Sequence, residues 1–427
     1  MKKIFFLTFF FSATALFANA YEGKGIGSRQ LAMGGASFGL ADDWTAIYWN
    51  PAGMAFLDRS QVGGDAHMSF LDQHSLIPIL NLPFPDYKKG YFQAYADEPV
   101  TFTNRHIGGI VYSGDLGVVL RMGKGALGFG FYGSAGTGSD WKDVFLLTKG
   151  IYRTIIMAFN VPFCFAYRIS DTVSLGANLS LLIGITDRES GKTHISINNP
   201  SVSYYYRSKS DGTGIGAEAT LGMLWKPIQW FSGGIIFRSP YLLYARGTAS
   251  MQHTAYPLYP GGPVLPVRDS TGLVTKWFYP VRAGAGVAFR PAAWVTIAVD
   301  TYWVNWSSMY FDFDYRRTTF YFIDKKVNFH LHDTVQAKIG VEFIVGMFSI
   351  RAGFYTDPSP YRNDMASVLT PRFSNAWIIT GGMGLKLEAI SIDASYNHAF
   401  VENRKAQMNA IGGSVDIVSL GCKYSFM

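Results

Sequence analysis

Charged residues at alternate positions in the second half of the chain are the side chains most able to do chemistry. Arg282, Asp300, Lys338, Glu342 and Arg351 fall on the polar sides of four successive alternating segments. Neighbouring strands of a sheet lie about 4.8 Å apart, so these five could form one charged belt. The belt could bind the carboxylate of a ligand. Alternatively, its members pair with one another and with acids elsewhere in the chain, because buried charges must be compensated.

A second candidate is the stretch GLADDWTAIYWNPAGMAFLD, from Gly39 to Asp58. Its carboxylates could face the belt and its apolar side chains could line a pocket; these are Asp42 and Asp43, then Trp44, Ile47, Tyr48 and Trp49. Pro51 lacks an N–H group and disfavours helix at Asn50. We therefore interpret Asn50, Pro51 and Ala52 as a hinge or latch at the base of a ligand pocket.

The sequence carries no familiar catalytic motif. GxSxG, HExxH and Walker motifs are missing from it, so a hydrolase would need an unrecognised serine and histidine. His330 and His332 would point to the same side of a strand, but a zinc site requires further ligands. We expect no enzyme activity, no metal and no cofactor.

Strict alternation of apolar and polar residues is the pattern that positions these side chains, since every second side chain of a strand points the same way. In TVQAKIGVEFIV, from Thr334 to Val345, the apolar residues share one side and Gln, Lys, Gly and Glu share the other. About fourteen such strands are predicted, near residues 59–70, 115–122, 126–135, 152–170, 172–184, 213–226, 229–246, 276–290, 293–305, 333–345, 347–356, 374–387, 389–400 and 413–426. Tight turns alternate with long connections between them, which is typical of a bacterial barrel with its long loops outside the cell.

Composition favours the same class. Aromatic residues make up 16 % of the 427 residues, charged residues only 16 %, and the formal charge of +7 forms no basic face, so we expect no nucleic-acid partner. Residues 1–20 have the basic start, apolar run and small-residue end of a signal peptide. After them no segment has the roughly 20 apolar residues of a membrane helix. An exported, aromatic-rich chain of this kind indicates an outer-membrane barrel.

Residues 21–58 precede the first predicted strand and do not alternate. A segment this short cannot build its own core, so we expect it to plug the barrel from inside. The predicted fold is all-β: a signal peptide at 1–20, an N-terminal hatch at 21–58, and a transmembrane antiparallel β-barrel at 59–427.

The stretch LAMGGASFGLADDWTAIYWNPAGMA resembles the hatch motif of the FadL/TodX family, outer-membrane transporters of long-chain fatty acids and other hydrophobic compounds. Similar blocks follow in strand order: VPFCFAYRISDTVSLGANLSLL, GIIFRSP, PVRAGAGVAFRPAAWVTIAVDTYWVNWS and IRAGFYTDPSPY. The last strand, with apolar residues at alternate positions up to Phe426, resembles the signal read by the barrel assembly machinery.

The resemblance implies ligand capture at extracellular loops and lateral exit through a kink in the third strand. That strand is GALGFGFYGSAGTG, in which Gly128, Gly130, Gly133 and Gly136 lack side chains. Glycine in a strand often marks a bulge, or these glycines simply make room for the hatch. The candidate capture loop, HSLIPILNLPFPDY, exposes apolar residues; they are Leu76, Ile77, Ile79, Leu80, Leu82 and Phe84. A second candidate is the loop at 254–267, and either loop could instead fold inward as packing.

We expect a monomer that takes up long-chain fatty acids or similar hydrophobic compounds by passive, hatch-gated lateral diffusion. Its partners would be the ligand, outer-membrane lipid and lipopolysaccharide around the barrel, and the barrel assembly machinery. One alternative is an interaction partner in secretion or surface attachment, because barrels of that kind carry a similar MGGA, ADD and WNPA stretch. Another alternative is an outer-membrane lipid hydrolase.

If Asn50 and Pro51 form a latch, replacing both should change ligand uptake more than barrel assembly. Uptake of a labelled fatty acid by cells measures the first, and heat-modifiable migration on a gel measures the second. An equal loss of folded barrel would show that these residues are scaffold.

Overall fold

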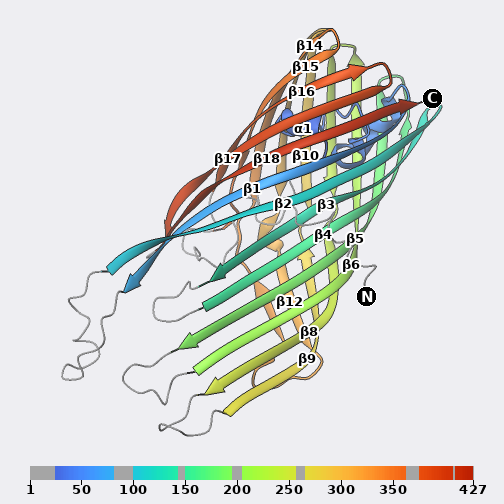
Figure 1. Cartoon of the computed structure of the whole chain (residues 1–427). Coiled ribbons are helices and arrows are strands. Elements are labelled where there is room, and N and C mark those ends of the chain that lie inside the picture. Colours follow the sequence, from blue (N-terminus) through green and yellow to red (C-terminus); the bar gives the residue numbers. More distant parts are fainter. Residues whose placement is uncertain are drawn as a thin grey trace.

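The chain forms one antiparallel sheet that closes on itself as a barrel (Figure 1). The computed structural model describes residues 25–80, 100–142, 150–194, 204–255, 265–361, 375–406 and 409–426. The predicted signal peptide lies outside these residues. Closure comes from β1, which pairs with β2 on one side and with β18 on the other. Within the described ranges, no helix has both the length and the apolar character to cross a membrane.

Ten strands run uninterrupted. They are β1 (Ser60–Leu80), β2 (Val100–Met122), β3 (Gly125–Lys142), β4 (Gly150–Arg168), β5 (Val173–His194), β6 (Tyr204–Ile228), β15 (Phe348–Asp357), β16 (Ala376–Leu387), β17 (Ile390–Ala406) and β18 (Asn409–Phe426).

Four further strands are each interrupted once. Their parts are β7 (Phe231–Arg238) with β8 (Tyr241–Ala255), β9 (Leu265–Tyr279) with β10 (Arg282–Ala292), β11 (Val295–Val304) with β12 (Tyr310–Tyr315), and β13 (Lys325–Asn328) with β14 (Thr334–Val345). Both parts of each interrupted strand pair with the same neighbouring strands; β7 and β8, for example, both pair with β6. The eighteen elements therefore make fourteen strands, and the predicted barrel is confirmed.

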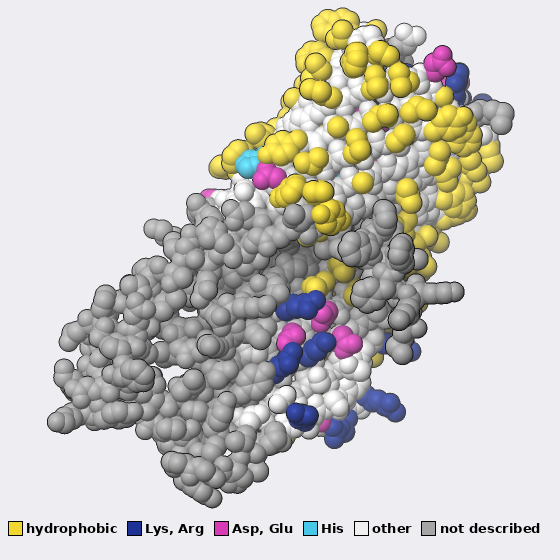
Figure 2. All heavy atoms as spheres, in the orientation of Figure 1, with side chains coloured by type: hydrophobic (Ala, Val, Ile, Leu, Met, Phe, Trp, Pro, Cys, Tyr) yellow, Lys and Arg dark blue, Asp and Glu magenta, His cyan; other side chains and the backbone are white. Residues whose placement is uncertain are grey.

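The outside of this barrel is apolar and its inside is polar, as alternation predicts. Leu179 on β5 is 61 % exposed, whereas Ser180 beside it is 1 % exposed. Exposed Leu, Ile, Val and aromatic side chains form a belt around the barrel (Figure 2). Exposed apolar and buried polar side chains are the pattern expected of a wall surrounded by lipid.

The tight turns lie at the same end of the barrel as the C-terminus. Gly123 and Gly346 turn there with φ of 59° and 62°, a region that glycine enters without a steric penalty. Ser60 pairs with Phe426 at this end. Because barrels of this class place their short turns in the periplasm, this end is periplasmic and the longer connections are outside the cell.

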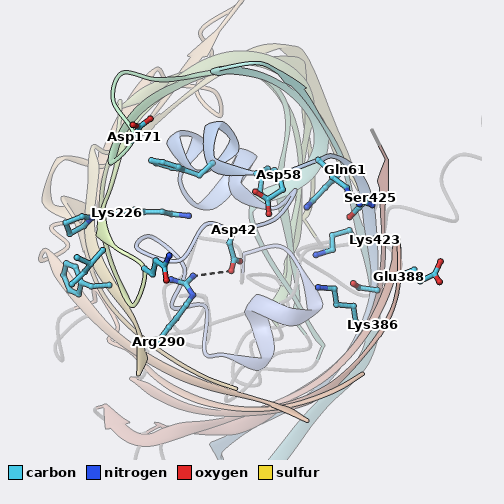
Figure 3. Close-up of a pocket in the computed structure, with 18 residues that line it drawn as sticks. Asp42, Asp58, Gln61, Asp171, Lys226, Arg290, Lys386, Glu388, Lys423 and Ser425 are labelled. Atoms are coloured by element: carbon cyan, nitrogen blue, oxygen red, sulfur yellow. Dashed lines mark hydrogen bonds and ion pairs between the residues drawn. The ribbon is translucent and has the colours of Figure 1, made fainter. Parts of the chain in front are cut away.

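Residues 25–58, named here the lumenal segment, lie inside the barrel near its periplasmic end (Figures 1 and 3). The segment contains two short helices, α1 (Ser28–Ala32) and α2 (Ala46–Trp49), and a 3-10 helix, η1 (Pro51–Phe56). Helix α1 packs against β15, β16 and β17, and η1 packs against β4, β5 and β6. The segment therefore contacts opposite sides of the wall.

Glycines in the strands allow this close contact. A Cβ atom built at Gly176 on β5 would lie 2.3 Å from the Ala52 nitrogen, and one at Gly340 on β14 would lie 2.2 Å from the Met33 carbonyl oxygen. Both partners are backbone atoms that cannot rotate away. Only glycine fits at these two positions.

One pair of neighbouring strands separates early. β2 and β3 pair over seven residues, from Met122↔Gly125 to Leu116↔Phe131. Beyond these pairs β2 continues beside β1, while β3 continues beside β4 with a register shift between Gly133 and Ala135. Figure 1 shows the two strands diverging toward the outer end.

The predicted capture loop is partly strand. β1 continues through Pro78 to Leu80, so the expectation that Leu76, Ile77, Ile79 and Leu80 lie in a loop was wrong. Beyond Leu76, β1 pairs only with β2, and an edge of this kind tolerates proline. Leu82, Phe84 and most of the second candidate loop, residues 256–264, lie outside the described residues.

The glycine contacts predict that Gly340→Val releases the lumenal segment without unfolding the barrel, because a side chain there would overlap the Met33 backbone. Trypsin should then cleave after Arg29 in a barrel that still shows heat-modifiable migration. Gly381→Val is the matched control, since a Cβ atom there approaches only the Arg351 carbonyl oxygen, at 3.7 Å. Equal protease resistance of the two variants would contradict the prediction.

Candidate functional site

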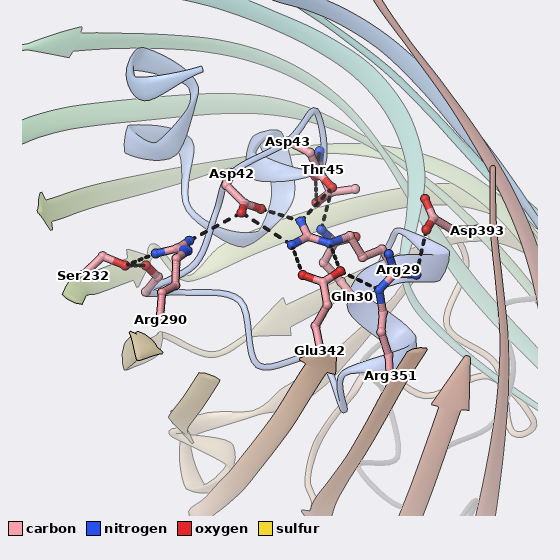
Figure 4. A network of polar contacts seen from close by, with 11 residues as sticks. Arg29, Gln30, Asp42, Asp43, Thr45, Ser232, Arg290, Glu342, Arg351 and Asp393 are labelled. Atoms are coloured by element: carbon pink, nitrogen blue, oxygen red, sulfur yellow. Dashed lines mark hydrogen bonds and ion pairs between the residues drawn. The ribbon is translucent and has the colours of Figure 1, made fainter. Parts of the chain in front are cut away.

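A chain of alternating charges ties the lumenal segment to the wall (Figure 4). Arg29 on α1 donates two hydrogen bonds to Glu342 on β14, at 2.9 and 2.7 Å. Arg351 on β15 donates to the same carboxylate at 2.7 Å and to Asp393 on β17 at 2.7 Å. The Glu342 and Arg351 side chains are almost fully buried. Removing one partner of such a pair leaves a charge without compensation.

The chain continues through Asp42. Arg29 donates to Asp42 at 2.5 Å, and Arg290 on β10 lies 3.4 Å from the other carboxylate oxygen. Burial alone would raise the pKa of Asp42, but Arg29 and then Arg290 hold it below its usual value. Burial would likewise lower the pKa of Arg29, yet Asp42 and Glu342 raise it above its usual value. Both groups are therefore charged at neutral pH.

Asp43 has a different role from its neighbour. One oxygen accepts hydrogen bonds from the Thr45 N–H at 2.9 Å and from its hydroxyl at 2.6 Å, and the other accepts from the Gln30 amide at 2.8 Å. Asp43 therefore closes a turn within the lumenal segment, whereas Asp42 connects the segment to the wall.

Two more members of the predicted belt also hold the segment. Asp300 on β11 accepts hydrogen bonds from the N–H groups of Ser37, at 2.5 Å, and Phe38, at 2.8 Å. The Lys338 ammonium group lies 5.2 Å from the centre of the Trp49 ring and 5.8 Å from that of Phe38. The geometry thus favours structural pairing over carboxylate binding for these belt residues.

Arg282 does not belong to this belt. It pairs with Glu218 on β6 and lies over the Tyr279 ring at 4.7 Å. On β10, Arg282 is four residues further out than Gly286, the residue paired with Asp300, or about 14 Å along the strand. Glu342 is likewise four residues from Lys338, the residue paired with Asp300. The expectation of a single belt of five residues was wrong because strand length separates positions that share a face.

An aromatic cluster lines the lumen at the outer side of the lumenal segment and includes one residue of that segment, Tyr48. Its rings pack at centroid distances of 4.9 to 5.6 Å: Tyr241 on Tyr279, Tyr48 on Tyr132, Tyr279 on Trp306, and Trp277 on Phe311. All seven side chains are buried. Two guanidinium groups lie among them, those of Arg282 and Arg238. Apolar rings with a few polar groups among them are also the composition of sites that bind small apolar molecules.

Arg238 links this cluster to the lumenal segment. Its guanidinium lies 4.3 Å from the centre of the Tyr48 ring and donates a 2.7 Å hydrogen bond to the Tyr48 carbonyl oxygen. Tyr48 is the member of the predicted pocket that reaches the aromatic cluster.

The other three predicted pocket residues are packing residues. A Cβ atom at Gly63 would lie 2.2 Å from Trp44 Nε1, and one at Gly130 would lie 2.6 Å from Ile47 Cδ1. Trp49 donates a 2.9 Å hydrogen bond from Nε1 to the Ile26 carbonyl oxygen. These side chains fill the space between the segment and the wall, so the structure does not support the expectation that they face a pocket.

The Asn50 break forms as predicted. Asn50 is extended, with φ −154° and ψ 103°, between α2 and η1, and Pro51 opens η1. The Asn50 amide donates to the Phe38 carbonyl oxygen at 2.9 Å and to that of Met223 on β6 at 3.0 Å, and its oxygen accepts from the Ala52 N–H at 3.2 Å. These bonds fasten the segment to itself and to the wall; the latch role stays a prediction.

The glycines of β3 divide between the two alternatives. Cβ atoms at Gly128 and Gly130 would lie 2.8 and 2.6 Å from Ile47, so these two make room for the segment. Gly133 lies at the register shift, just beyond the last β2 pair, where β2 and β3 separate. For Gly136 the structure describes only the backbone.

The structure brings a serine, a histidine and an aspartate together near the point where β2 and β3 separate, and the sequence analysis did not identify them. His67 contacts Ser419 through Nδ1 and Asp115 through Nε2, both at 2.7 Å. The Ser419 side chain is buried, as are those of His67 and Asp115, and a nucleophile must reach its substrate. We interpret these three side chains as a structural group whose members satisfy one another's hydrogen bonds and join β18, β1 and β2.

Arg29, Arg238 and Glu218 were also missed. Arg29 is the one cation close before two aspartates in a segment of small residues, and this pattern could have identified it. No local pattern identifies Arg238 or Glu218. The expected strand placement of His330 was wrong, because its φ of 48° lies outside a strand. Among the described residues, no group of three or more His, Cys, Asp or Glu could hold a metal ion.

The periplasmic mouth beneath the segment is wide and charged (Figure 3). Its cavity measures about 1310 Å³ and is lined mainly by polar groups of both signs; the charged ones are Asp42, Asp58, Arg59, Asp171, Lys226, Arg290, Lys386, Glu388 and Lys423. An apolar molecule gains little by entering such a space.

A closed fourteen-strand barrel with an apolar belt and an occupied lumen is an outer-membrane β-barrel of the plugged class. The chain belongs to the outer membrane protein transport family (OMPP1/FadL/TodX), whose model matches residues 4–424. Members of this family are transport channels.

Solved structures share the fold at low identity. A Pseudomonas aeruginosa FadL homologue superposes with a TM-score of 0.71 at 17 % identity, covering 96 % of this chain and 100 % of the homologue. The Pseudomonas putida toluene transporter TodX gives 0.67 at 16 %, covering 95 % and 99 %. The Ralstonia pickettii toluene transporter TbuX gives 0.64 at 15 %, covering 95 % and 99 %. No curated protein matches the sequence.

The charge network predicts that Arg29→Gln loosens the lumenal segment and opens an ion path, because Glu342 and Asp42 lose a shared cation. Losing one partner of a buried pair costs about 3–5 kcal/mol. Conductance in planar bilayers should rise, and a double variant, Arg29→Gln with Glu342→Gln, should conduct less than the single one. Arg59→Gln, an exposed cation at the same mouth, is the control. Wild-type conductance in Arg29→Gln would refute the network's role.

Proposed function

We propose that this protein takes up long-chain fatty acids or other hydrophobic compounds by passive diffusion through the barrel wall, with the lumenal segment as the hatch. The observation that carries the proposal is the early separation of β2 and β3. From the first to the last of their seven pairs the distance is about 20 Å along strands tilted by roughly 45°, hence about 14 Å of height. The apolar belt of such barrels is about 25 Å tall. The opening thus begins inside the bilayer.

The aromatic cluster meets this opening. Tyr132 is the first β3 residue beyond the last pair with β2, and its ring contacts Tyr48 at 5.1 Å in an edge-to-face arrangement. On the other side Asp115 is the first β2 residue beyond that pair, and His67 satisfies its carboxylate. A ligand leaving the cluster here would pass the Tyr132 ring on one side and, on the other, the Asp115 carboxylate, which His67 satisfies.

Energetics favour sideways exit over passage to the periplasm. Each CH₂ group transferred from water to lipid gains about 0.8 kcal/mol, so an alkyl chain is stabilised when it enters the bilayer. The alternative route crosses the lumenal segment and the charged mouth described above. We infer that the segment blocks the axis and that the opening provides the exit.

The ligand we propose first is a hydrophobic acid. Arg238 lies over the Tyr48 ring, and a guanidinium group suits a carboxylate; Arg282, which lies over Tyr279, is already paired with Glu218. Two of the similar structures are described as toluene transporters, so a monoaromatic compound is the second ligand class to test. Both classes use the same aromatic cluster, and only the acid requires the Arg238 cation.

The register shift in β3 predicts the decisive variant. Deleting Ser134, between Gly133 and Ala135, should remove the shift and let β2 and β3 pair further outward. Uptake of a labelled fatty acid should fall roughly tenfold while its dissociation constant for purified protein changes less than about twofold, because the exit is impaired and not the site.

Ser134→Ala, which keeps the extra residue, is the control and should transport normally. Binding of toluene to the purified wild type, measured in parallel, separates the two ligand classes. If neither compound binds, and a deletion strain takes up both normally, the transporter proposal fails and an interaction role becomes the better account.

A further inference from the structure

The outer surface of the barrel carries a cationic patch beyond the apolar belt. Figure 2 shows Lys and Arg side chains, with some acids, gathered between the belt and the outer end. A cavity of about 710 Å³ lies at this rim, lined by Arg207, Lys209, Ser250, Met251, Gln252, Arg268, Asp269, Ser270 and Arg317. We call these residues the rim site.

Strand register shows that most of the rim site faces outward. Arg207 and Lys209 lie on the same face of β6 as Ile215, which is 64 % exposed. Across β6, β8 and β9, two rows of partners are in register: Arg207, Gln252 and Arg268, then Lys209, Ser250 and Ser270. Each row spans about 10 Å. Cations, hydroxyls and an amide thus form one compact surface.

Charge at the rim site is not balanced by the described residues. Arg207 donates to Glu189 at 2.7 Å, and Arg317 pairs with Asp269. No carboxylate among the described residues forms an ion pair with Lys209 or Arg268. Lys209 on β6 and Arg268 on β9 thus line one cavity from either side of β8, beside the hydroxyl groups of Ser250 and Ser270, and neither cation is in a described ion pair. A phosphate group fits this set of donors.

Height above the belt indicates where that phosphate comes from. Lys209 is six residues outward of Ile215 on β6, about 20 Å along the strand and about 14 Å along the membrane normal at a tilt near 45°. This level lies above the acyl chains and their first head groups. In the outer leaflet of an outer membrane it is the level of the phosphorylated inner sugars of lipopolysaccharide.

We propose that the rim site binds lipopolysaccharide through its inner-core phosphates, with Lys209 and Arg268 as the principal contacts and Arg207 and Arg317 beside them. The lipid-facing wall continues directly below, so the acyl chains of the same molecule would lie against the apolar belt. The site is separate from the proposed ligand passage, because β6, β8 and β9 are not the strands that separate.

The test compares two double variants. The rim variant combines Lys209→Gln with Arg268→Gln. The control variant combines Lys124→Gln with Arg59→Gln and so removes the same charges at the periplasmic end. Binding of rough lipopolysaccharide to each purified barrel in detergent is measured by native mass spectrometry or thermophoresis. Each lost charge-assisted contact should weaken binding by about tenfold. The rim variant should therefore bind at least tenfold more weakly, and the control should bind like the wild type.

Two further arms make the result decisive. Lipopolysaccharide treated with phosphatase should bind the wild type as weakly as untreated lipid binds the rim variant. Heat-modifiable migration checks that every variant is folded. Equal affinity of the rim and control variants would overturn the proposal, and so would undiminished binding of the dephosphorylated lipid or equal competition by phosphatidylglycerol.

Discussion

The rest of this structure depends on one constraint: in hydrocarbon, every backbone N–H and C=O group needs a partner within the protein. The sheet meets it by closing β1 onto β18. The interrupted strands also meet it, since β9 and β10 stay paired with β8 and β7 across the Pro280 break. Against this background the early end of pairing between β2 and β3 leaves backbone groups that need other partners, and this is why we propose the exit there.

Closure creates a lumen, and the lumen must be filled without leaving charges uncompensated. The chain fills it with the lumenal segment. Glycines at Gly176 and Gly340 bring backbone against backbone, while Arg29 shares Glu342 with Arg351. The packing of the segment against the wall is rigid, but only a few ion pairs hold it. One residue, Arg29, connects the wall at β14 to Asp42 and through it to Arg290 on β10, so the segment is held as a unit.

The sequence was most informative where a local period carries the signal. Alternation alone predicted fourteen strands, because a two-residue repeat follows directly from strand geometry. It predicted strand ends poorly: β1 extends to Leu80 and β2 begins at Val100, since the extensions beyond the membrane need no apolar face. Pairings across the lumen, such as Arg282 with Glu218, depend on which strands lie opposite each other and on their height. A local sequence pattern specifies neither which strands lie opposite each other nor the height of a residue along its strand.

Polarity along the barrel then gives the proposed path its direction. The belt outside is apolar, the aromatic cluster inside is apolar with two guanidinium groups, and the periplasmic mouth is charged. A hydrophobic molecule in the cluster would therefore be better solvated by the bilayer than by the mouth, and the exit that we propose between β2 and β3 leads to the bilayer. The proposed path would be driven by burial of apolar surface and by the concentration gradient of the ligand. The Tyr48 and Tyr132 contact lies where cluster, segment and opening meet, so movement of the segment and passage of a ligand would be coupled through these two rings.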